Sequence, residues 1–292
     1  MIVAITPCPC LDRVLRLEAL QPGTLSRPHP VAERAGGKGF NLVRAVVRLG
    51  GEAMVVAPLG GWAGREVRRL AQAEGLPLRA VSGPRTRLCH ILLHPGGPTE
   101  LYEPCSPVRP VFWRHLAEAI PPGLRVLSGS LPGGANPNEV LRLFRPYAVD
   151  SAAAFGAALD AAPLGVRLIK PNRHELALLH PGSPLQAAWE LHRRSGLRVL
   201  ASLGEEGAVY AGPEGVWWAI PPLREGNPVG AGDTLLGAFL LAAERGFPPE
   251  RALAFATAAG TASVGQGGGE VELREVEALL PKVEVRDVVP RP

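Results

Sequence analysis

The chain reads Asn227-Pro228-Val229-Gly230-Ala231-Gly232-Asp233-Thr234 where a glycine-rich turn meets a long apolar segment. That segment runs over residues 235–242 and ends at Gly246, a pattern typical of a buried helix. A turn of this kind leaves unpaired N–H groups at the start of the helix, where an anion is held best. The stretch therefore predicts an anion-binding turn that opens a buried helix.

Asp233 stands beside this turn and suggests chemistry as well as binding. A carboxylate there can accept a proton from an attacking hydroxyl, while the amides of Gly230, Ala231 and Gly232 hold a transferring phosphoryl group. The same residues also suit an ordinary glycine loop with an acidic residue in the first helical turn. Other parts of the chain must separate the two interpretations.

A second glycine turn opens a helix near the N-terminus. It reads Gly36-Gly37-Lys38-Gly39-Phe40-Asn41 and is followed by apolar residues at helical spacing. The chain contains only three lysines and five asparagines, and this turn holds one of each. We expect a polar cradle for a hydroxylated or phosphorylated ligand, although a flexible turn would have the same composition.

Two extended stretches, about residues 12–32 and 85–105, interrupt an otherwise regular alternation of strand-like and helical segments. The alternation predicts an α/β fold, and the two stretches predict a small β lid inserted in it. A lid excludes water from phosphoryl transfer, so the layout favours a kinase. An exposed lid edge would also favour a homodimer through strand pairing.

Polar residues follow two further predicted strands. Asp150 and Ser151 end one of them, at the sheet edge where doubly wound folds bind ligands. Lys170-Pro171-Asn172-Arg173-His174-Glu175 follows the other. Asn172 and Glu175 have the spacing of a capping box, which explains them without a catalytic role, but capping and ligand binding are compatible.

Composition narrows the class of protein. The 292 residues suit one large α/β domain or two small ones. The net charge is +4, but Arg68-Arg69 and Arg193-Arg194 are the only adjacent basic pairs, which argues against a nucleic-acid partner. The N-terminal run has no basic region before it, and no apolar run approaches the length of a membrane span. We expect a cytoplasmic protein without membrane contact.

The four cysteines are Cys8, Cys10, Cys89 and Cys105. They are too few for a disulfide scaffold and lack the paired spacing of a zinc site. Their position in the first third of the chain leaves a metal site or a single disulfide open. We expect four buried thiols.

Several motifs together resemble those of the ribokinase-like (PfkB) sugar kinase family. They are the two glycine turns, Gly36–Asn41 and Val229–Thr234, and four blocks in the family's order: Ser128-Gly129-Ser130-Leu131-Pro132, Val149-Asp150-Ser151, Lys170-Pro171-Asn172-x-x-Glu175 and Ser202-Leu203-Gly204-x-x-Gly207. The resemblance covers nearly the whole chain. It implies a single domain, residues 1–292, with a ribokinase-like three-layer α/β/α fold, a mainly parallel central sheet and a β-sheet lid. The Lys170 and Asn227 motifs and Thr99-Glu100-x-x-Glu103-Pro104 are most similar to the 1-phosphofructokinase and tagatose-6-phosphate kinase branch.

The resemblance implies an ATP- and Mg²⁺-dependent transfer to a hydroxyl of a sugar phosphate, with fructose 1-phosphate preferred and tagatose 6-phosphate second. By the family pattern Asp233 is the base and the amides from Gly230 to Gly232 form the anion hole. The implied sugar-phosphate ligands are Asp12, Gly37, Lys38, Asn41, Arg87 and Ser130. The implied nucleotide ligands are Lys170, Asn172, Ser202, Gly204 and Gly207, and Glu175 would organise magnesium through water.

Charge gives a separate reason to expect a phosphorylated acceptor. Lys38 lies in a glycine turn and Arg87 leads into the predicted lid over the same pocket. Two cations near one small site repel each other unless an anion lies between them, and a phosphate dianion would do so. Alternatively, Arg87 points to solvent and Lys38 serves the ATP phosphates alone.

Two departures from the family pattern lie near the expected sugar pocket. The usual Asn-Pro-Ala-x-Asp appears as Cys8-Pro9-Cys10-Leu11-Asp12, and Cys89 replaces the Asn two places after the lid arginine. They leave the acceptor sugar open. A non-catalytic regulator that binds a sugar or a nucleotide is the rival class, and the retention of Asp233 between its glycines and helix argues against it.

Overall fold

The computed structural model describes residues 1–160, 164–266 and 268–288. Within these residues a ten-stranded sheet runs in the order β14-β13-β12-β11-β10-β9-β8-β1-β4-β5. From β5 to β11 neighbouring strands are parallel, and β12 to β14 add an antiparallel edge. In chain order the strands are β1 (Ile2–Ile5), β4 (Ala53–Leu59), β5 (Leu78–Ser82), β8 (Leu124–Ser128), β9 (Ala148–Asp150), β10 (Leu168–Ile169), β11 (Arg198–Ser202), β12 (Ala208–Gly212), β13 (Gly215–Ile220) and β14 (Glu284–Asp287).

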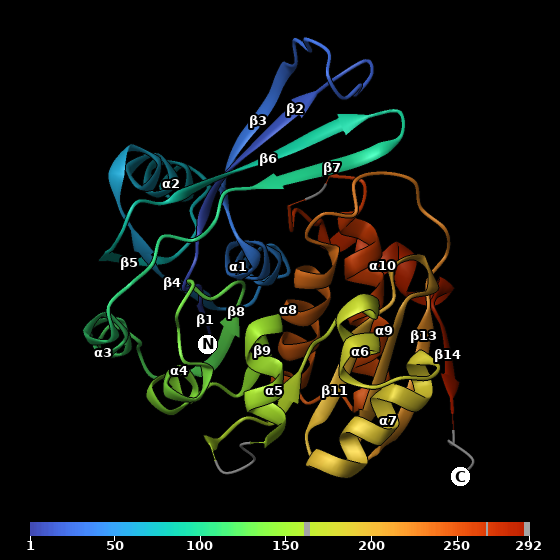
Figure 1. The fold of residues 1–292 in the computed structure, drawn as a ribbon. Coiled ribbons are helices and arrows are strands. Elements are labelled where there is room, and N and C mark those ends of the chain that lie inside the picture. Colours follow the sequence, from blue (N-terminus) through green and yellow to red (C-terminus); the bar gives the residue numbers. More distant parts are fainter. Residues whose placement is uncertain (161–163, 267, 289–292) are drawn as a thin grey trace.

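Helices cover both faces of this sheet (Figure 1). One face packs on α1 (Lys38–Arg48), α2 (Gly61–Ala73), α8 (Ala231–Glu244), α9 (Pro249–Ser263) and α10 (Leu273–Leu279). The other packs on α3 (Pro110–Glu118), α4 (Pro137–Phe144), α5 (Ala152–Asp160), α6 (Arg173–Leu179) and α7 (Pro184–Ser195).

Strand β1 shows why the sheet needs both helical layers. Ile2 and Ala4 belong to the first apolar cluster, whereas Val3 and Ile5 belong to the second, and all four side chains are fully buried. Side chains alternate between the faces of a strand, so a strand that is apolar at every position must be covered on both sides. The predicted three-layer α/β/α arrangement is confirmed.

A second sheet of four strands forms the lid, in the order β3-β2-β6-β7. Its strands are β2 (Cys10–Arg16), β3 (His29–Gly36), β6 (Arg87–His94) and β7 (Gly97–Tyr102). Figure 1 shows it projecting from one end of the core, in blue and teal at the top. The predicted lid stretches, 12–32 and 85–105, both contribute strands to this second sheet. The first lid segment begins two residues earlier and extends to Gly36, and residues 17–28 between its strands form no strand or helix.

Some elements escaped the sequence analysis. Strand β14 follows α10 and adds an exposed edge to the sheet. Strand β5 at the opposite edge is only partly buried, and α3 begins at a proline after a polar stretch. These peripheral elements bury few residues, so their apolar periodicity is weak.

The expectation of four buried thiols is wrong for two of them. Cys8 and Cys105 form a disulfide across a Cα–Cα distance of 5.9 Å, whereas Cys10 and Cys89 are free and buried. Cys8 precedes the first lid strand and Cys105 follows the last, so the fold brings together residues that are 97 positions apart in the sequence. Spacing along the chain does not reveal such a pair.

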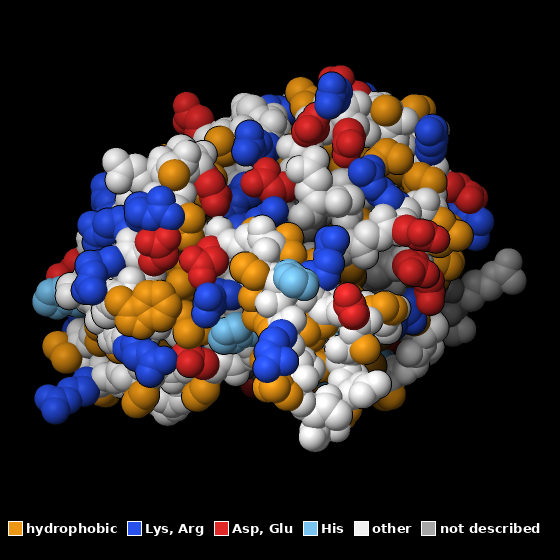
Figure 2. All heavy atoms as spheres, turned by 90° about the horizontal axis from the view of Figure 1, so that it is seen from above, with side chains coloured by type: hydrophobic (Ala, Val, Ile, Leu, Met, Phe, Trp, Pro, Cys, Tyr) orange, Lys and Arg blue, Asp and Glu red, His pale blue; other side chains and the backbone are white. Residues whose placement is uncertain are grey.

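Two expectations concern partners. Among the residues that the structure describes, no helix combines the length and the apolar character that a bilayer crossing requires. On the lid side of the molecule, basic and acidic side chains are interspersed (Figure 2), and this face shows no continuous basic stripe. A nucleic-acid site would concentrate its positive charge.

Candidate active site

The start of α8 forms the predicted anion-binding turn. Gly230 caps the helix in the left-handed region, with φ of 89°, and a Cβ there would lie 2.9 Å from the backbone nitrogen of Gly269. The Ala231 amide donates to the Pro228 carbonyl at 3.0 Å, so the turn itself uses it. In the described part of the chain, the amides of Gly230 and Gly232 donate to no acceptor. These two amides, rather than all three, can hold an anion.

Asp233 lies one residue beyond, with 6% of its surface exposed. Asn41 donates from Nδ2 to its Oδ2 at 2.8 Å. Burial, and next the charge of Asp150, raise the pKa of Asp233 to about 7, against the lowering effects of Lys38, Lys170 and Asn41. A carboxylate with a pKa near neutrality is well matched to accept and release protons.

Two lysines pair with Asp150 beside the Asp233 carboxylate. Lys38 Nζ lies 2.8 Å and Lys170 Nζ 3.5 Å from Asp150 Oδ1, and Asp150 is fully buried. Although burial lowers it, the pKa of Lys38 is raised overall because Asp150, Asp233 and Glu175 attract its charge. Lys38 and Asp150 are 112 residues apart, so sequence analysis did not pair them. The sequence placed Asp150 at the ligand-binding edge of the sheet and within a family motif, without a partner.

This ion pair corrects the charge argument made from the sequence. Lys38 was expected to repel Arg87 across the sugar pocket, but Asp150 already compensates the charge of Lys38. Arg87 donates from Nη1 to the Glu103 carbonyl at 3.1 Å and lies over the ring of Tyr102. The uncompensated repulsion that called for a phosphate is therefore absent between these two residues.

Glu175 has the capping role considered for it, and the cap uses only one of its carboxylate oxygens. Asn172 and Glu175 form a complete capping box at the start of α6, with both hydrogen bonds at 2.8 Å. The second carboxylate oxygen, Oε1, lies 3.9 Å from Lys38 Nζ. Capping therefore uses one oxygen of Glu175 and leaves the other facing the lysine cluster.

The nucleotide-side residues meet the turn of α8. An isolated bridge pairs Asn172 with Ser202, at the end of β11. A Cβ on Gly232 would lie 3.4 Å from Lys170 Nζ and 3.5 Å from Ser202 Oγ. Lys170 and Ser202 therefore adjoin Gly232, and Asn172 lies beside Ser202.

The loop after Ser202 depends on two glycines. Gly204 opens a short 3-10 helix (Gly204–Glu206) with φ of 67°, and Gly207 closes it with φ of 89°. A Cβ on Gly207 would lie 1.9 Å from the Ala219 carbonyl oxygen, so no other residue fits there without movement of the hairpin. The two glycines thus allow the backbone of this loop to lie close to the site.

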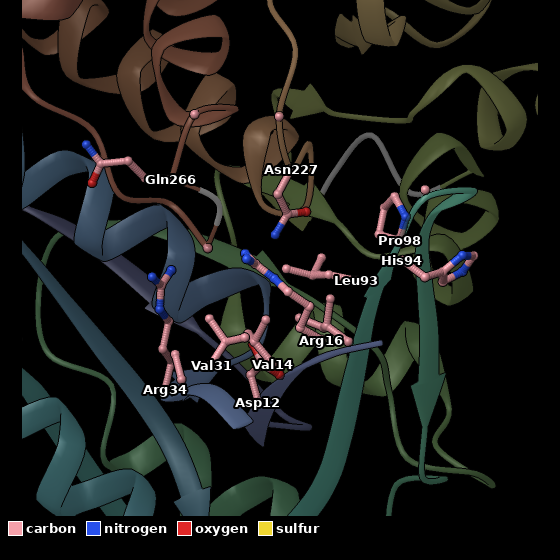
Figure 3. Close-up of a pocket in the computed structure, with 16 residues that line it drawn as sticks. Asp12, Val14, Arg16, Val31, Arg34, Leu93, His94, Pro98, Asn227 and Gln266 are labelled. Atoms are coloured by element: carbon pink, nitrogen blue, oxygen red, sulfur yellow. The ribbon is translucent and has the colours of Figure 1, made fainter. Parts of the chain in front are cut away.

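The lid supplies the opposite wall. Asp12 on β2 pairs with Arg34 on β3 and with Cys89 on β6, so the three side chains share the inner face of the lid. A cavity of about 380 Å³ lies between this face and the core (Figure 3). Its walls include Asp12, Arg16, Arg34 and His94 from the lid and Asn227 and Gln266 from the core.

Glycines hold Asp12 and the start of α1 in place. A Cβ on Gly36 would lie 2.2 Å from Asp12 Cγ, so the carboxylate rests against bare backbone. Gly37 caps α1 with φ of 107°, and its carbonyl accepts a hydrogen bond from the backbone N–H of Asn41 at 3.2 Å. Burial raises the pKa of Asp12 to about 6, against the lowering influence of Cys10, Arg44 and Arg87.

Of the six predicted sugar-phosphate ligands, Asp12 lines the large cavity, and the other five lie outside its lining: Gly37, Lys38, Asn41, Arg87 and Ser130. Arg87 lines a smaller hollow beside the Cys8–Cys105 disulfide, with its Nε buried and unpaired. Ser130 is exposed in the loop after β8. In this structure the cavity's own basic side chains are Arg16, Arg34 and His94.

The comparisons with known proteins fit this geometry. The family model described as pfkB family carbohydrate kinase matches residues 5–275. The chain belongs to that family. As a pfkB kinase it is a phosphotransferase that acts on a sugar hydroxyl, with ATP as the phosphoryl donor and typically a divalent metal.

Individual relatives of this pfkB kinase cover almost the whole chain. A 1-phosphofructokinase of Haloferax volcanii is 33% identical and covers 99% of both sequences. The ATP-dependent 6-phosphofructokinase isozyme 2 of Escherichia coli is 31% identical over 90% of this chain and 92% of its own. The crystal structure of Escherichia coli phosphofructokinase-2 with substrates and products superimposes with a TM-score of 0.87 at 28% identity, covering 96% and 98% of the two chains.

Sequence analysis missed one residue that orients Asn41 toward Asp233. Arg44 is 1% exposed and donates from Nη1 to Asn41 Oδ1 at 3.1 Å. That bond turns the Asn41 amide nitrogen toward Asp233. Other donors of Arg44 reach the Ala35 and Gly268 carbonyls, so it ties α1 to two loops of the site. The available signal was an arginine three residues after Asn41 within an apolar helical run.

Proposed function

We propose that this chain is an ATP-dependent 1-phosphofructokinase, which converts fructose 1-phosphate and ATP to fructose 1,6-bisphosphate and ADP. The observation that carries the proposal is the buried Asp233, with a pKa of about 7, beside the free amides of Gly230 and Gly232. The 33% identity to a relative named 1-phosphofructokinase, over 99% of both chains, supports the choice of acceptor.

The core residues have distinct roles in the proposed phosphoryl transfer. The acceptor hydroxyl gives its proton to Asp233 as its oxygen attacks the γ-phosphorus, and the bond to ADP breaks. The amides of Gly230 and Gly232 stabilise the negative charge on the transferring group. Asn41 keeps the Asp233 carboxylate oriented, and Lys38 and Lys170 bring positive charge to the phosphates.

The same edge of the sheet fits Mg²⁺. Asp150 Oδ2 is buried and has no partner among the described residues, and Glu175 Oε1 is not used by the capping box. Carboxylate oxygens are the ligands that Mg²⁺ prefers, usually with several waters retained. We propose that Glu175, through water, and Asp150 hold a magnesium ion, which supplies charge neutralisation at the ATP phosphates when bound.

The lid face is proposed to hold the sugar phosphate. Asp12 suits a pair of sugar hydroxyls, as do the polar groups at Gly37 and Asn41 on the core side. Arg34 and Arg16 line the cavity and suit the phosphate, since guanidinium groups bind phosphate through paired hydrogen bonds. Arg87 and Ser130 remain candidates for the same phosphate if the lid rearranges on binding.

We also propose a homodimer formed through the lid. Its edge strands, β3 and β7, expose Val31, Leu101 and Tyr102, with 49–54% of each side chain accessible. Open strand edges with apolar side chains favour pairing with a second copy. Light scattering on the purified protein tests this, since Leu101→Lys should shift a dimer toward monomers.

A cytoplasmic location stays a prediction as well. Intracellular disulfides are unusual outside hyperthermophiles, so the Cys8–Cys105 bridge bears on it directly. Thiol counting on protein extracted under acid quench would show whether the bridge forms in the cell.

An ADP-release assay across free and phosphorylated ketoses tests the proposed acceptor. We expect the highest kcat/KM with fructose 1-phosphate and the next with tagatose 6-phosphate. Equal turnover of free fructose, ribose or a nucleoside would contradict the acceptor while leaving the family intact. Binding of a sugar phosphate without any ADP release would instead favour a non-catalytic regulator.

A further inference from the structure

Three potential metal ligands meet on the inner face of the lid. Cys10 and Asp12 are two residues apart on β2, and Cys89 stands opposite Asp12 on β6, so the three side chains share one face. The two sulfurs and a carboxylate oxygen all lie within 4.8 Å of one another. Cys10 Sγ donates to Asp12 Oδ1 at 3.0 Å.

This spacing is close to that of a zinc site. Zn–S bonds of about 2.3 Å and Zn–O bonds of about 2.1 Å place the ligands of a tetrahedral ion roughly 3.5 to 3.8 Å apart. Small rotamer changes would bring the two sulfurs and the carboxylate oxygen to these distances, because the three residues are neighbours on one pair of strands. Thiolate ligands select thiophilic ions such as Zn²⁺ over Mg²⁺.

Burial and exposure are arranged as in a metal site with an open position. Cys10 is 2% exposed and Cys89 is fully buried, whereas Asp12 lines the large cavity. An ion bound to the three side chains would therefore keep its remaining coordination position toward the cavity. Water or a small ligand can reach that position.

Nearby charges suit a bound dication. Two thiolates, one carboxylate and Zn²⁺ carry a net charge of minus one, and Arg44 and Arg87 lie close enough to Asp12 to act on its charge. Binding releases one proton from each thiol to solvent. The positive charges of Arg87 and of Arg44, which also pairs with Glu74, favour this remaining negative charge.

We propose that Cys10, Cys89 and Asp12 form a binding site for a thiophilic divalent ion, of which Zn²⁺ is the chosen probe. The site follows from this chain's own residues, because Cys10 and Cys89 stand where the resemblance to the family places alanine and asparagine. It goes beyond phosphoryl transfer and needs neither ATP nor sugar.

Occupation of the site has a consequence that rests on the proposed function. Asp12 cannot bind a metal ion and sugar hydroxyls with the same oxygens. Zn²⁺ should therefore inhibit in competition with the sugar phosphate and not with ATP. Metal binding itself is measured without substrate, so it can succeed or fail independently of the kinase assignment.

Direct metal titration is the test. Protein freed of metal with EDTA, its Cys8–Cys105 bridge intact, is titrated with Zn²⁺ against a chromogenic chelator and with Co²⁺ by absorption spectroscopy. We expect one ion per chain and a thiolate-to-Co²⁺ charge-transfer band. Cys10→Ala and Cys89→Asn should each weaken Zn²⁺ binding by more than ~100-fold, because even residues that only orient ligands contribute ~10- to 100-fold.

The matched control removes the other two cysteines. Cys8→Ser with Cys105→Ser abolishes the bridge but leaves the three donors, so Zn²⁺ binding and the Co²⁺ band should persist. The proposal is overturned if wild-type protein shows no thiolate band, or if Cys10→Ala with Cys89→Asn binds Zn²⁺ as tightly as wild type. It is equally overturned if mass spectrometry finds Cys10 and Cys89 joined as a second disulfide in native protein. The spectrum of the wild type needs no variant, so poor folding of a variant leaves the test decisive.

Discussion

The core edge beneath α8 and the inner face of the lid supply opposite walls of the active site, and they differ in how their polar groups are paired. In the core, Asn41 donates to Asp233 and Lys38 pairs with Asp150, and the charges of Lys38 and Asp150 both act on Asp233. On the lid, Arg16 is exposed at the end of its strand and lines an open cavity. Side chains that already contact one another provide the fixed geometry that phosphoryl transfer needs. A side chain that is exposed to the cavity, such as Arg16, is available to bind a ligand. Core substitutions should therefore lower kcat, and lid substitutions should raise KM for the acceptor.

The largest effect is expected for Asp233→Asn. The substitution keeps the shape of the side chain and removes the proton acceptor, so kcat should fall by ~10²- to 10⁴-fold while sugar and ATP still bind. Steady-state kinetics and calorimetric binding measure the two quantities. Glu244→Gln, at the far end of α8, is the control and should have wild-type kcat, since its ion-pair partner among the described residues is the chain's amino group. Near-normal turnover of Asp233→Asn would refute its role as base.

Glu175→Gln should raise the Mg²⁺ concentration needed for activity by ~10- to 100-fold, the range seen when a residue that orients a metal is lost. Glutamine still fits the capping box, so the melting temperature should change little. Glu139→Gln is the matched control, because Glu139 occupies the first turn of α4 behind its own Asn cap, away from the lysines. A drop in melting temperature with an unchanged Mg²⁺ requirement would reduce Glu175 to a capping residue.

The lid arginines distinguish two versions of the phosphate site. Arg34→Ala should raise KM for the sugar phosphate by at least tenfold, or ~1.4 kcal/mol, and leave KM for ATP nearly unchanged. The sequence favoured Arg87 as the phosphate ligand, but Arg87 lies outside the large cavity, so Arg87→Ala should raise this KM less than Arg34→Ala does. Arg13→Ala, whose side chain pairs with Glu33 on the outer face, is the control. The reverse ranking would show that the lid rearranges to bring Arg87 to the phosphate.

The smallest effect concerns pH. Asp233 must be deprotonated to act as base, and burial, followed by the charge of Asp150, raises its pKa to about 7. The kcat/KM of the enzyme should therefore fall about tenfold per unit as pH drops below that value. Lys38→Met removes a cation that lowers the pKa of Asp233, so the acidic limb of the pH profile of kcat/KM should move to higher pH. A limb near pH 4, typical of an ordinary aspartate, would contradict the buried environment.

The core half of the site was more predictable than the lid half, and residue types explain the difference. Gly230, Gly232 and Asp233 are neighbours in sequence, so one stretch displays their geometry. The apolar helix that follows has a strong periodic signal, and α8 spans Ala231–Glu244. Local rules of turn and helix chemistry suffice for such a unit.

Contacts across the chain were the part that local rules could not supply. The pairing of Lys38 with Asp150 and the bridge between Cys8 and Cys105 depend on how distant strands are ordered in their sheets. The cavity has the same origin, since Asp12 and Arg34 meet through strand register while Asn227 approaches from the core. The candidate site residues could therefore be named from the sequence, whereas the residues that they contact could not.

The Cys8–Cys105 bridge closes residues 8–105 into a covalent ring that contains all four lid strands. A ring that is cut once stays in one piece. Residues 17–28 lie within it outside any strand or helix, and Leu25 is 78% exposed, which makes this segment a favourable place for a protease to cut. Protein nicked beside Leu25 should therefore migrate as one intact chain on a non-reducing gel and separate into two fragments only after reduction.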